Sequence, residues 1–101
     1  MAAISKQVAR KFLEAVPEQY VFWCSDGRTL RNLKELEEAL VTMTDDTFAY
    51  HSNEQKSDFA SWVKDIIGDE QLADELRRAH NRDDAARSVS KRLTALKKLA
   101  R

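Results

Sequence analysis

The residues with the clearest chemical potential are His51, Asn53 and Asp58, which lie within one short segment of the chain. A histidine can act as a general base or a metal ligand, and a nearby carboxylate or amide can orient its ring. The alternative is that His51 packs or caps one turn after Phe48 on a short helix. Because no nucleophile, base and orienting group stand at a recognisable spacing, the sequence favours this packing role.

The other residues able to bind a metal ion or attack a substrate are isolated in the sequence. His80 is the second of two histidines and lies in a separate segment, where it favours the negative end of a helix dipole. Cys24 is the single cysteine, and a thiol in an apolar run is usually a small buried hydrophobe. Gly27 and Gly68 are too far apart to form a phosphate-binding loop. We therefore expect no metal ion, no cofactor and no enzymatic activity.

The charges are distributed unevenly, although the chain of 101 residues has no net charge. Residues 33–75 carry twelve acidic and three basic side chains, whereas residues 76–101 carry nine basic and two acidic ones. A basic segment can contact the phosphates of a nucleic acid or an acidic protein surface. The candidate contact residues are Arg87, Lys91, Arg92, Lys97, Lys98 and Arg101. The acidic segment 33–75 is an alternative partner within the same chain.

The composition favours one small helical domain spanning residues 1–101. Hydrophobic residues make up 43% and charged residues 34% of the chain, which suits a single apolar core. Two glycines and one proline favour helices joined by short loops over a fold rich in turns. The sequence has neither a membrane-spanning apolar run nor a signal peptide, so we expect a cytoplasmic protein without a membrane partner.

Capping residues and apolar spacing predict four to six helices and one short β-hairpin. The apolar run 19–25, the turn Asp26-Gly27 and the segment 28–31 are typical of a hairpin. The helices are expected from Ser5 to Pro17, after Asn32, over 46–52, from Ser57 to Gly68, after Asp69 and from Asp84 onward. The expected core comprises Phe12, Phe22, Leu36, Leu40, Phe48, Phe59, Trp62, Val63, Ile66, Leu72, Leu76, Val89, Leu93 and Leu96.

The last helix carries an apolar seam formed by Val89, Leu93 and Leu96. An isolated helix of this length is marginal in water, so the seam must be buried against the domain's own core or against a second copy of the chain. Its basic side chains are spread too widely for all of them to face inward. We expect the seam to dock and the basic face to point outward, where it would suit an acidic partner or a phosphate backbone.

Three short motifs follow one another in the middle of the chain. They read Thr47-Phe48-x-Tyr50-His51, Asp58-Phe59-Ala60-x-Trp62-Val63 and Gly68-Asp69-Glu70-x-Leu72-Ala73. With the glycine turn and Leu-rich helix upstream, they resemble a family of small uncharacterised prokaryotic domains over roughly residues 20–76. That family usually has asparagine where this chain has Ser57, and both residues are good N-caps. The resemblance implies no activity. The candidate surface residues of this signature are Tyr50, His51, Asn53, Lys56 and Asp58.

These patterns favour a non-enzymatic interaction or accessory domain that binds a protein partner. The alternative is a nucleic-acid-associated protein that binds phosphates through its basic C-terminal helix. A third interpretation is an enzyme or a ligand-binding site around His51.

Overall fold

Each of the six α-helices in the described part of the chain begins at a side chain that accepts a hydrogen bond from the backbone of its first turn. The computed structural model describes residues 4–101. The capping residues are Ser5, Asn32, Thr44, Ser57, Asp69 and Asn81. Such caps satisfy backbone N–H groups that have no partner inside the helix. These short polar side chains therefore divide the chain into its helices.

The fold is mainly α-helical, as the composition predicts. The helices are α1 (Lys6–Leu13), α2 (Leu33–Thr42), α3 (Asp45–His51), α4 (Asp58–Trp62), α5 (Glu70–Arg78) and α6 (Arg82–Leu99). α4 runs on into a π-helical segment, η2 (Val63–Ile67), and a 3-10 turn, η1, covers Glu18–Tyr20. Gly68 ends η2 with φ at 96°, the left-handed conformation that glycine adopts without strain.

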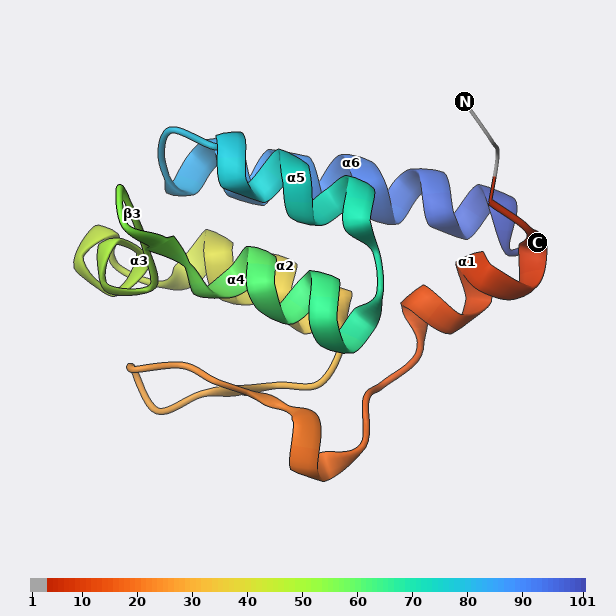
Figure 1. Cartoon of the computed structure of the whole chain (residues 1–101), viewed down its shortest axis with the longest axis horizontal. Helices are drawn as coiled ribbons and strands as arrows, with labels where there is room; N and C mark the ends of the chain where they lie inside the picture. The colour runs from red at the N-terminus through yellow and green to blue at the C-terminus, as the bar shows by residue number, and fades with distance from the viewer. Residues whose placement is uncertain (1–3) are drawn as a thin grey trace.

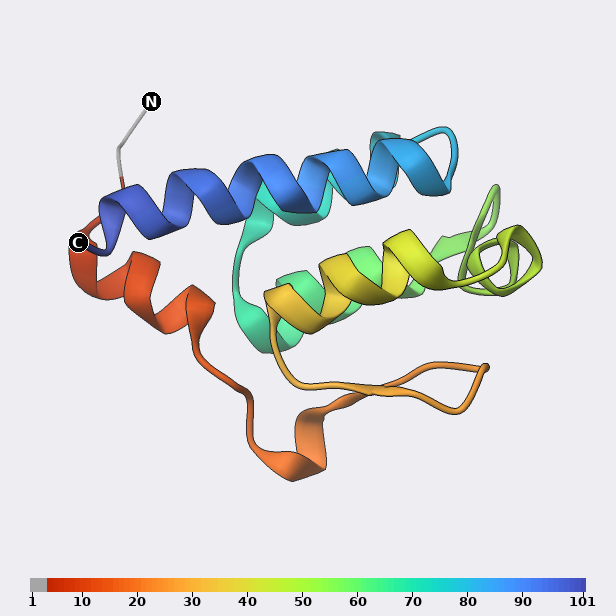
Figure 2. The same ribbon diagram turned by 180° about the vertical axis from the view of Figure 1, so that it is seen from behind.

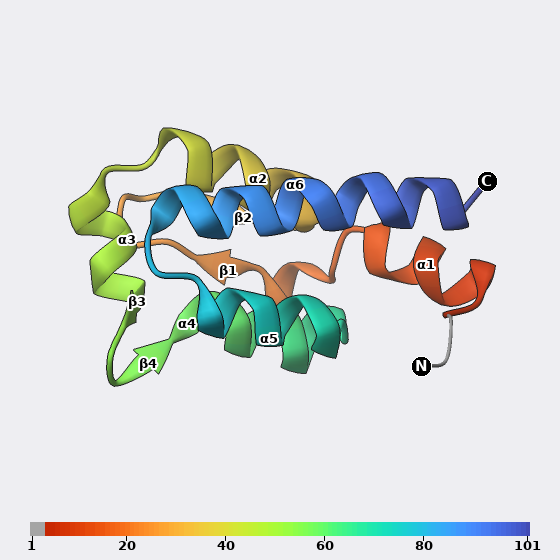
Figure 3. The ribbon, with the colours of Figure 1, turned by 90° about the horizontal axis from the view of Figure 1, so that it is seen from above.

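The helices form two layers, with a hairpin on the outer side of one of them (Figure 1). α5 and α6 make one layer and α2 and α4 the other, and α6 packs against α1, α2 and α5. Seen from above, α6 extends along the length of the molecule, with α2 towards one side of it and α5 towards the other (Figure 3). α1 reaches the far end of α6, where Arg10 Nε donates a hydrogen bond of 3.0 Å to the Ala100 carbonyl.

The predicted hairpin is present but much shorter than expected. β1 (Phe22–Trp23) and β2 (Thr29–Leu30) are antiparallel, with Phe22 opposite Leu30 and Trp23 opposite Thr29. The start of the expected strand 19–25 is instead η1, because the fixed φ of Pro17 favours a turn and its carbonyl accepts the Tyr20 N–H at 2.8 Å. A second hairpin, β3 (Ser52–Asn53) and β4 (Lys56–Ser57), was not expected from the sequence.

Three predicted helices differ from the structure at their ends. The first helix stops at Leu13, well before Pro17, because Glu14 already has extended backbone angles. The short third helix, Asp45–His51, begins and ends one residue earlier than expected, and β3 follows it directly. The last helix begins at Arg82 instead of Asp84, because Asn81 caps it by accepting the Asp84 N–H at 2.8 Å.

The apolar core is continuous and joins all six helices to the first hairpin. Most residues of the predicted core are buried, and the exceptions are Phe12 and Ile66, which are partly buried at its edge. Val89, Leu93 and Leu96 are at most 4% exposed, so the seam of α6 is buried within its own chain. The structure therefore answers the question left open by the sequence: this seam is not available to a second copy.

Candidate functional site

His51 is buried at the corner between α3 and α4, and both of its ring nitrogens are engaged. Its side chain is only 5% exposed. Nε2 accepts the Ser25 backbone N–H at 2.9 Å, so the proton of the neutral ring lies on Nδ1. Nδ1–H then donates to Asp58 Oδ2 at 3.0 Å. The sequence favoured a packing role for His51 but also placed it among the candidate surface residues; the structure places it inside, facing Phe22 and Phe59.

This arrangement gives His51 a structural role. A general base or a metal ligand needs a free nitrogen lone pair that a substrate or an ion can reach. The Ser25 N–H occupies that lone pair, and the aromatic rings cover the imidazole. His51 therefore ties the turn of the first hairpin to the start of α4.

The carboxylate of Asp58, at the start of α4, is held by the side chains of His51 and Lys56. It accepts hydrogen bonds from His51 and from Lys56 Nζ, each 3.0 Å long. Partial burial acts to raise the pKa of Asp58, but the bonds from His51 and Lys56 outweigh it, and the pKa lies below its ordinary value. Asp58 thus remains ionised well below neutral pH.

We predict that acid destabilises the wild-type protein more than Asp58→Asn. Because the pKa of Asp58 is lower in the folded than in the unfolded chain, its ionised carboxylate stabilises the fold above the unfolded value of about 4. That contribution is lost as the pH falls through the lower, folded value. Urea unfolding at about pH 6 and about pH 3 measures the effect. An equal loss of stability in both proteins would contradict it.

The remaining residues of the signature segment do not converge on one point. Tyr50 is 62% exposed, and Lys56 Nζ lies 5.0 Å from the centre of its ring. Asn53 turns back to its own backbone, donating to the Ala49 carbonyl and accepting the Gln55 N–H, each at 3.0 Å. These contacts shape the second hairpin and leave no common ligand position.

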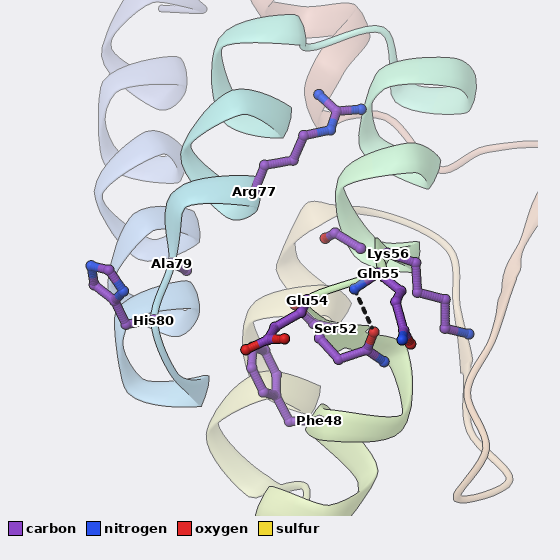
Figure 4. Close-up of a pocket in the computed structure, with 10 residues that line it drawn as sticks. Phe48, Ser52, Glu54, Gln55, Lys56, Arg77, Ala79 and His80 are labelled. Carbon is purple, nitrogen blue, oxygen red and sulfur yellow. Dashed lines mark hydrogen bonds between the residues drawn. The ribbon is translucent and has the colours of Figure 1, made fainter.

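A groove of about 650 Å³ lies between the second hairpin and the end of α5. Its lining includes Lys56, Arg77 and His80, which could in principle attract an anion. Their side chains point in different directions around the groove (Figure 4). Lys56 pairs with Asp58, and Arg77 pairs with Asp74 at 3.3 Å. The groove therefore lacks the converging polar groups of a catalytic or ligand-binding site.

Cys24 is buried beside the first hairpin turn. Burial raises the pKa of its thiol, and a backbone hydrogen bond at Asp26 offsets this only in part. A thiol of this kind is poorly nucleophilic at neutral pH. Cys24 thus acts as an apolar core residue, as expected from its place in the sequence.

The basic residues of α6 divide into an inward and an outward group. Arg92 belongs to the first group: its Nε and Nη2 donate to both carboxylate oxygens of Asp69, at 2.8 and 3.0 Å. The side chains are 10% and 1% exposed, so Arg92 is not available as a surface contact. Arg82 also faces the acidic segment, donating to the Leu40 and Val41 carbonyls and to Asp45. Part of the basic segment therefore pairs with the acidic one inside the molecule.

The outward group forms one row along the exposed side of α6. Figure 2 shows this helix over its full length. Arg87, Lys91 and Lys98 follow at spacings of four and seven residues, and such positions share one helix face, while Arg101 lies just beyond the end of α6. All four residues are exposed. Arg87 has a partner in Asp83 at 2.8 Å, and Lys97 is exposed as well. The basic face thus points outward, as predicted.

The most unusual surface residue was not singled out by the sequence analysis. Trp23 is 75% exposed on β1, and Tyr20 just before it is 50% exposed. Phe22 and Cys24 on either side of Trp23 are buried, so the alternation of a strand turns the indole outward. The sequence shows only a continuous apolar run here, so it does not indicate which of these side chains faces outward. Continuing the register places Arg31, which is also exposed, diagonally across the hairpin from Trp23.

Comparisons with known proteins give no independent guide to function. No family model, no curated protein and no solved structure matches this chain. Over residues 4–101, no helix combines the length and apolar character needed to cross a membrane. In the same range, no group of three or more histidine, cysteine or acidic side chains is arranged to hold a metal ion.

Proposed function

We propose that this protein is a non-enzymatic interaction domain that binds a protein partner through its first hairpin. The contact surface, called here the hairpin face, consists of Tyr20, Trp23, Thr29 and Arg31. The observation that carries the proposal is the 75% exposure of Trp23 on a strand whose other side chains are buried. The engaged nitrogens of His51 and the dispersed side chains of the groove favour binding over catalysis.

The composition of the hairpin face matches that of the energetic centres of protein interfaces. Tryptophan, tyrosine and arginine are the residue types most enriched there, because they bury a large area and still offer a polar group. The hairpin lies on the outer side of the helical layers, so a partner can approach it (Figure 1). The Arg31 backbone N–H donates to Glu35 at 2.8 Å, but its guanidinium lies 4.0 Å from that carboxylate and can turn towards an acidic group of the partner.

We predict that Trp23→Ser abolishes binding of the partner without changing the fold. The stability should change by no more than about 0.5 kcal/mol, because little of the indole is buried in the free protein. Val41→Ser is the matched control, since Val41 is 60% exposed on α2 and is not part of the hairpin face. Tagged wild-type, Trp23→Ser and Val41→Ser proteins should be used to capture partners from the cells that make the protein.

The wild type and Val41→Ser should retain the same protein, which Trp23→Ser should lose. Binding of that protein in purified form should then repeat the difference between the variants. Retention of an identical set of proteins by all three chains would refute the proposal.

A second candidate function is favoured by the outward row of cations on α6. Arg87, Lys91, Lys98 and Arg101 can follow the phosphate backbone of a nucleic acid, since regularly spaced cations neutralise phosphates without reading sequence. These residues are not among the basic side chains that pair inside the fold, as Arg82 and Arg92 do.

We predict for this second function that binding to a random DNA duplex weakens steeply with salt. Lys91→Glu with Lys98→Glu should abolish binding, whereas Lys11→Glu with Lys64→Glu, which changes the net charge equally elsewhere, should have a smaller effect. A titration at about 50 and about 200 mM salt measures both. Absence of binding at the lower salt concentration rejects the nucleic-acid function and leaves the protein-binding proposal intact.

A further inference from the structure

His51 connects the hairpin face to the body of the protein through two hydrogen bonds: its ring accepts one and donates the other. Towards the hairpin turn, Nε2 accepts the Ser25 N–H at 2.9 Å. Towards α4, Nδ1–H donates to Asp58 at 3.0 Å. Ser25 lies two residues after Trp23, so this link fixes the turn beside the exposed indole. Only the neutral ring with its proton on Nδ1 can make both bonds.

The two bonds respond in opposite ways when His51 gains a second proton. Nε2 then carries a hydrogen and points it at another donor, the Ser25 N–H, so that bond is lost. The bond to Asp58 becomes a charge-assisted hydrogen bond and strengthens. Because the pKa of Asp58 is lowered, its carboxylate stays ionised in the range about pH 5–8, where histidine side chains change charge. The protonated ring would therefore stay with α4 and release the hairpin.

The charged and titratable groups around His51 come from every element that faces it. On the hairpin side are Cys24 and Asp26, and Asp26 is paired with Arg28 at 3.1 Å. On α3, Tyr50 meets the imidazole with ring centres 5.0 Å apart. On α4, Asp58 Oδ2 accepts hydrogen bonds from both His51 and Lys56 of β4. The carboxylate that bonds the ring directly is that of Asp58, 3.0 Å from Nδ1.

We propose that protonation of His51 unlatches the turn at residues 24–28 and thereby changes the presentation of the hairpin face to its partner. The latch is the hydrogen bond from the Ser25 N–H to His51 Nε2. The effect on the partner rests on the proposed function; the loss of the latch does not. Two strands of two residues are marginal alone, so the loss of the Ser25 tether loosens the turn. Phe22 and Leu30 remain in the core and hold the base of the hairpin. The expected change is therefore local and not an unfolding of the domain.

Amide hydrogen exchange of the isolated protein tests the latch. Between about pH 8 and about pH 5, the protection factor of the Ser25 amide should fall by roughly fivefold, the effect of losing one hydrogen bond. Protection of the Val63 amide, which donates to the Phe59 carbonyl in the core, should stay constant. The ring nitrogens of His51, followed by NMR, should show protonation of Nε2 with the same midpoint.

Three variants separate this latch from other effects of pH. Asp58→Asn removes the negative charge that bonds to the ring. The fall in the protection factor of the Ser25 amide, called here the Ser25 transition, should therefore occur at a lower pH. His51→Gln should abolish the transition, and His80→Gln, at an exposed histidine, should keep it. A constant Ser25 protection factor in the wild type overturns the proposal, as does an unchanged transition in Asp58→Asn. If His51→Gln does not fold, the Ser25 protection factors of the wild type and of Asp58→Asn still decide whether the proposal holds.

The partner separates this inference from the proposed function. A Ser25 transition in a protein that shows no Trp23-dependent capture supports the latch and refutes the proposed function. If capture depends on Trp23, the affinity of the purified partner should differ between about pH 8 and about pH 5 for the wild type and not for His51→Gln. An equal response of both proteins overturns the coupling.

Discussion

Replacing Arg92 with alanine should lower the free energy of unfolding by about 3–5 kcal/mol, because the change leaves the Asp69 carboxylate buried without its counter-charge. Asp69 is 1% exposed and holds Arg92 through two hydrogen bonds, at 2.8 and 3.0 Å. The same carboxylate caps α5 by accepting the Leu72 N–H at 3.2 Å. Chemical unfolding of the wild type and Arg92→Ala measures the difference.

Two further variants show whether the buried charge is the cause. Asp69→Asn combined with Arg92→Met removes both charges, keeps a side chain that can cap α5 and fills part of the space. The double variant should be more stable than Arg92→Ala. Arg87→Ala breaks an ion pair whose side chains are 78% and 68% exposed, and it should have no measurable effect. A stability loss of Arg92→Ala no larger than that of Arg87→Ala would contradict this account.

Trp62→Ala should be comparably damaging, at about 3–5 kcal/mol, because it empties a large volume in the core. The prediction from sequence that Trp62 lies inside is confirmed, since it is 7% exposed and packs edge-on against Phe22. Its Nε1 also donates to the Tyr20 carbonyl at 2.8 Å, which holds η1 and the hairpin against α4. Such a loss is a large share of the roughly 5–15 kcal/mol that stabilises a domain.

Trp62→Phe is the matched control for the hydrogen bond. It keeps an aromatic ring in the core and removes only the N–H donor and part of the volume, so its loss should be clearly smaller than that of Trp62→Ala. Thermal unfolding of the two variants ranks them. A Trp62→Ala protein that melts like the wild type would show that this contact is not an anchor.

Local signals in the sequence were sufficient to predict the helices and most of the core. Capping side chains act within one turn, so Ser57 and Asp69 mark helix starts without reference to the rest of the fold. The second hairpin could not be predicted in this way. Its turn residues, Glu54 and Gln55, are not a typical turn pair, and it forms because the Asn53 side chain accepts the Gln55 N–H.

The functional surfaces were harder to predict because they depend on contacts between distant segments. The partner of His51 Nε2 is a backbone group 26 positions earlier, which no local pattern indicates. Arg92 offered a partial signal: it lies three residues after Val89 and four before Leu96, at the edge of the buried seam. Trp23 offered none, because Phe22 and Cys24 on either side of it are apolar as well.

A photo-crosslinking residue at position 23 tests the central claim, that the hairpin face binds a protein partner, most directly. It should be compared with the same residue at position 41, which is also exposed but lies on α2. Both variants should be irradiated in the cells that make the protein, and the adducts identified by mass spectrometry. The account predicts one discrete protein adduct from position 23 and none from position 41. No adduct at position 23, or the same adducts from both positions, would contradict it.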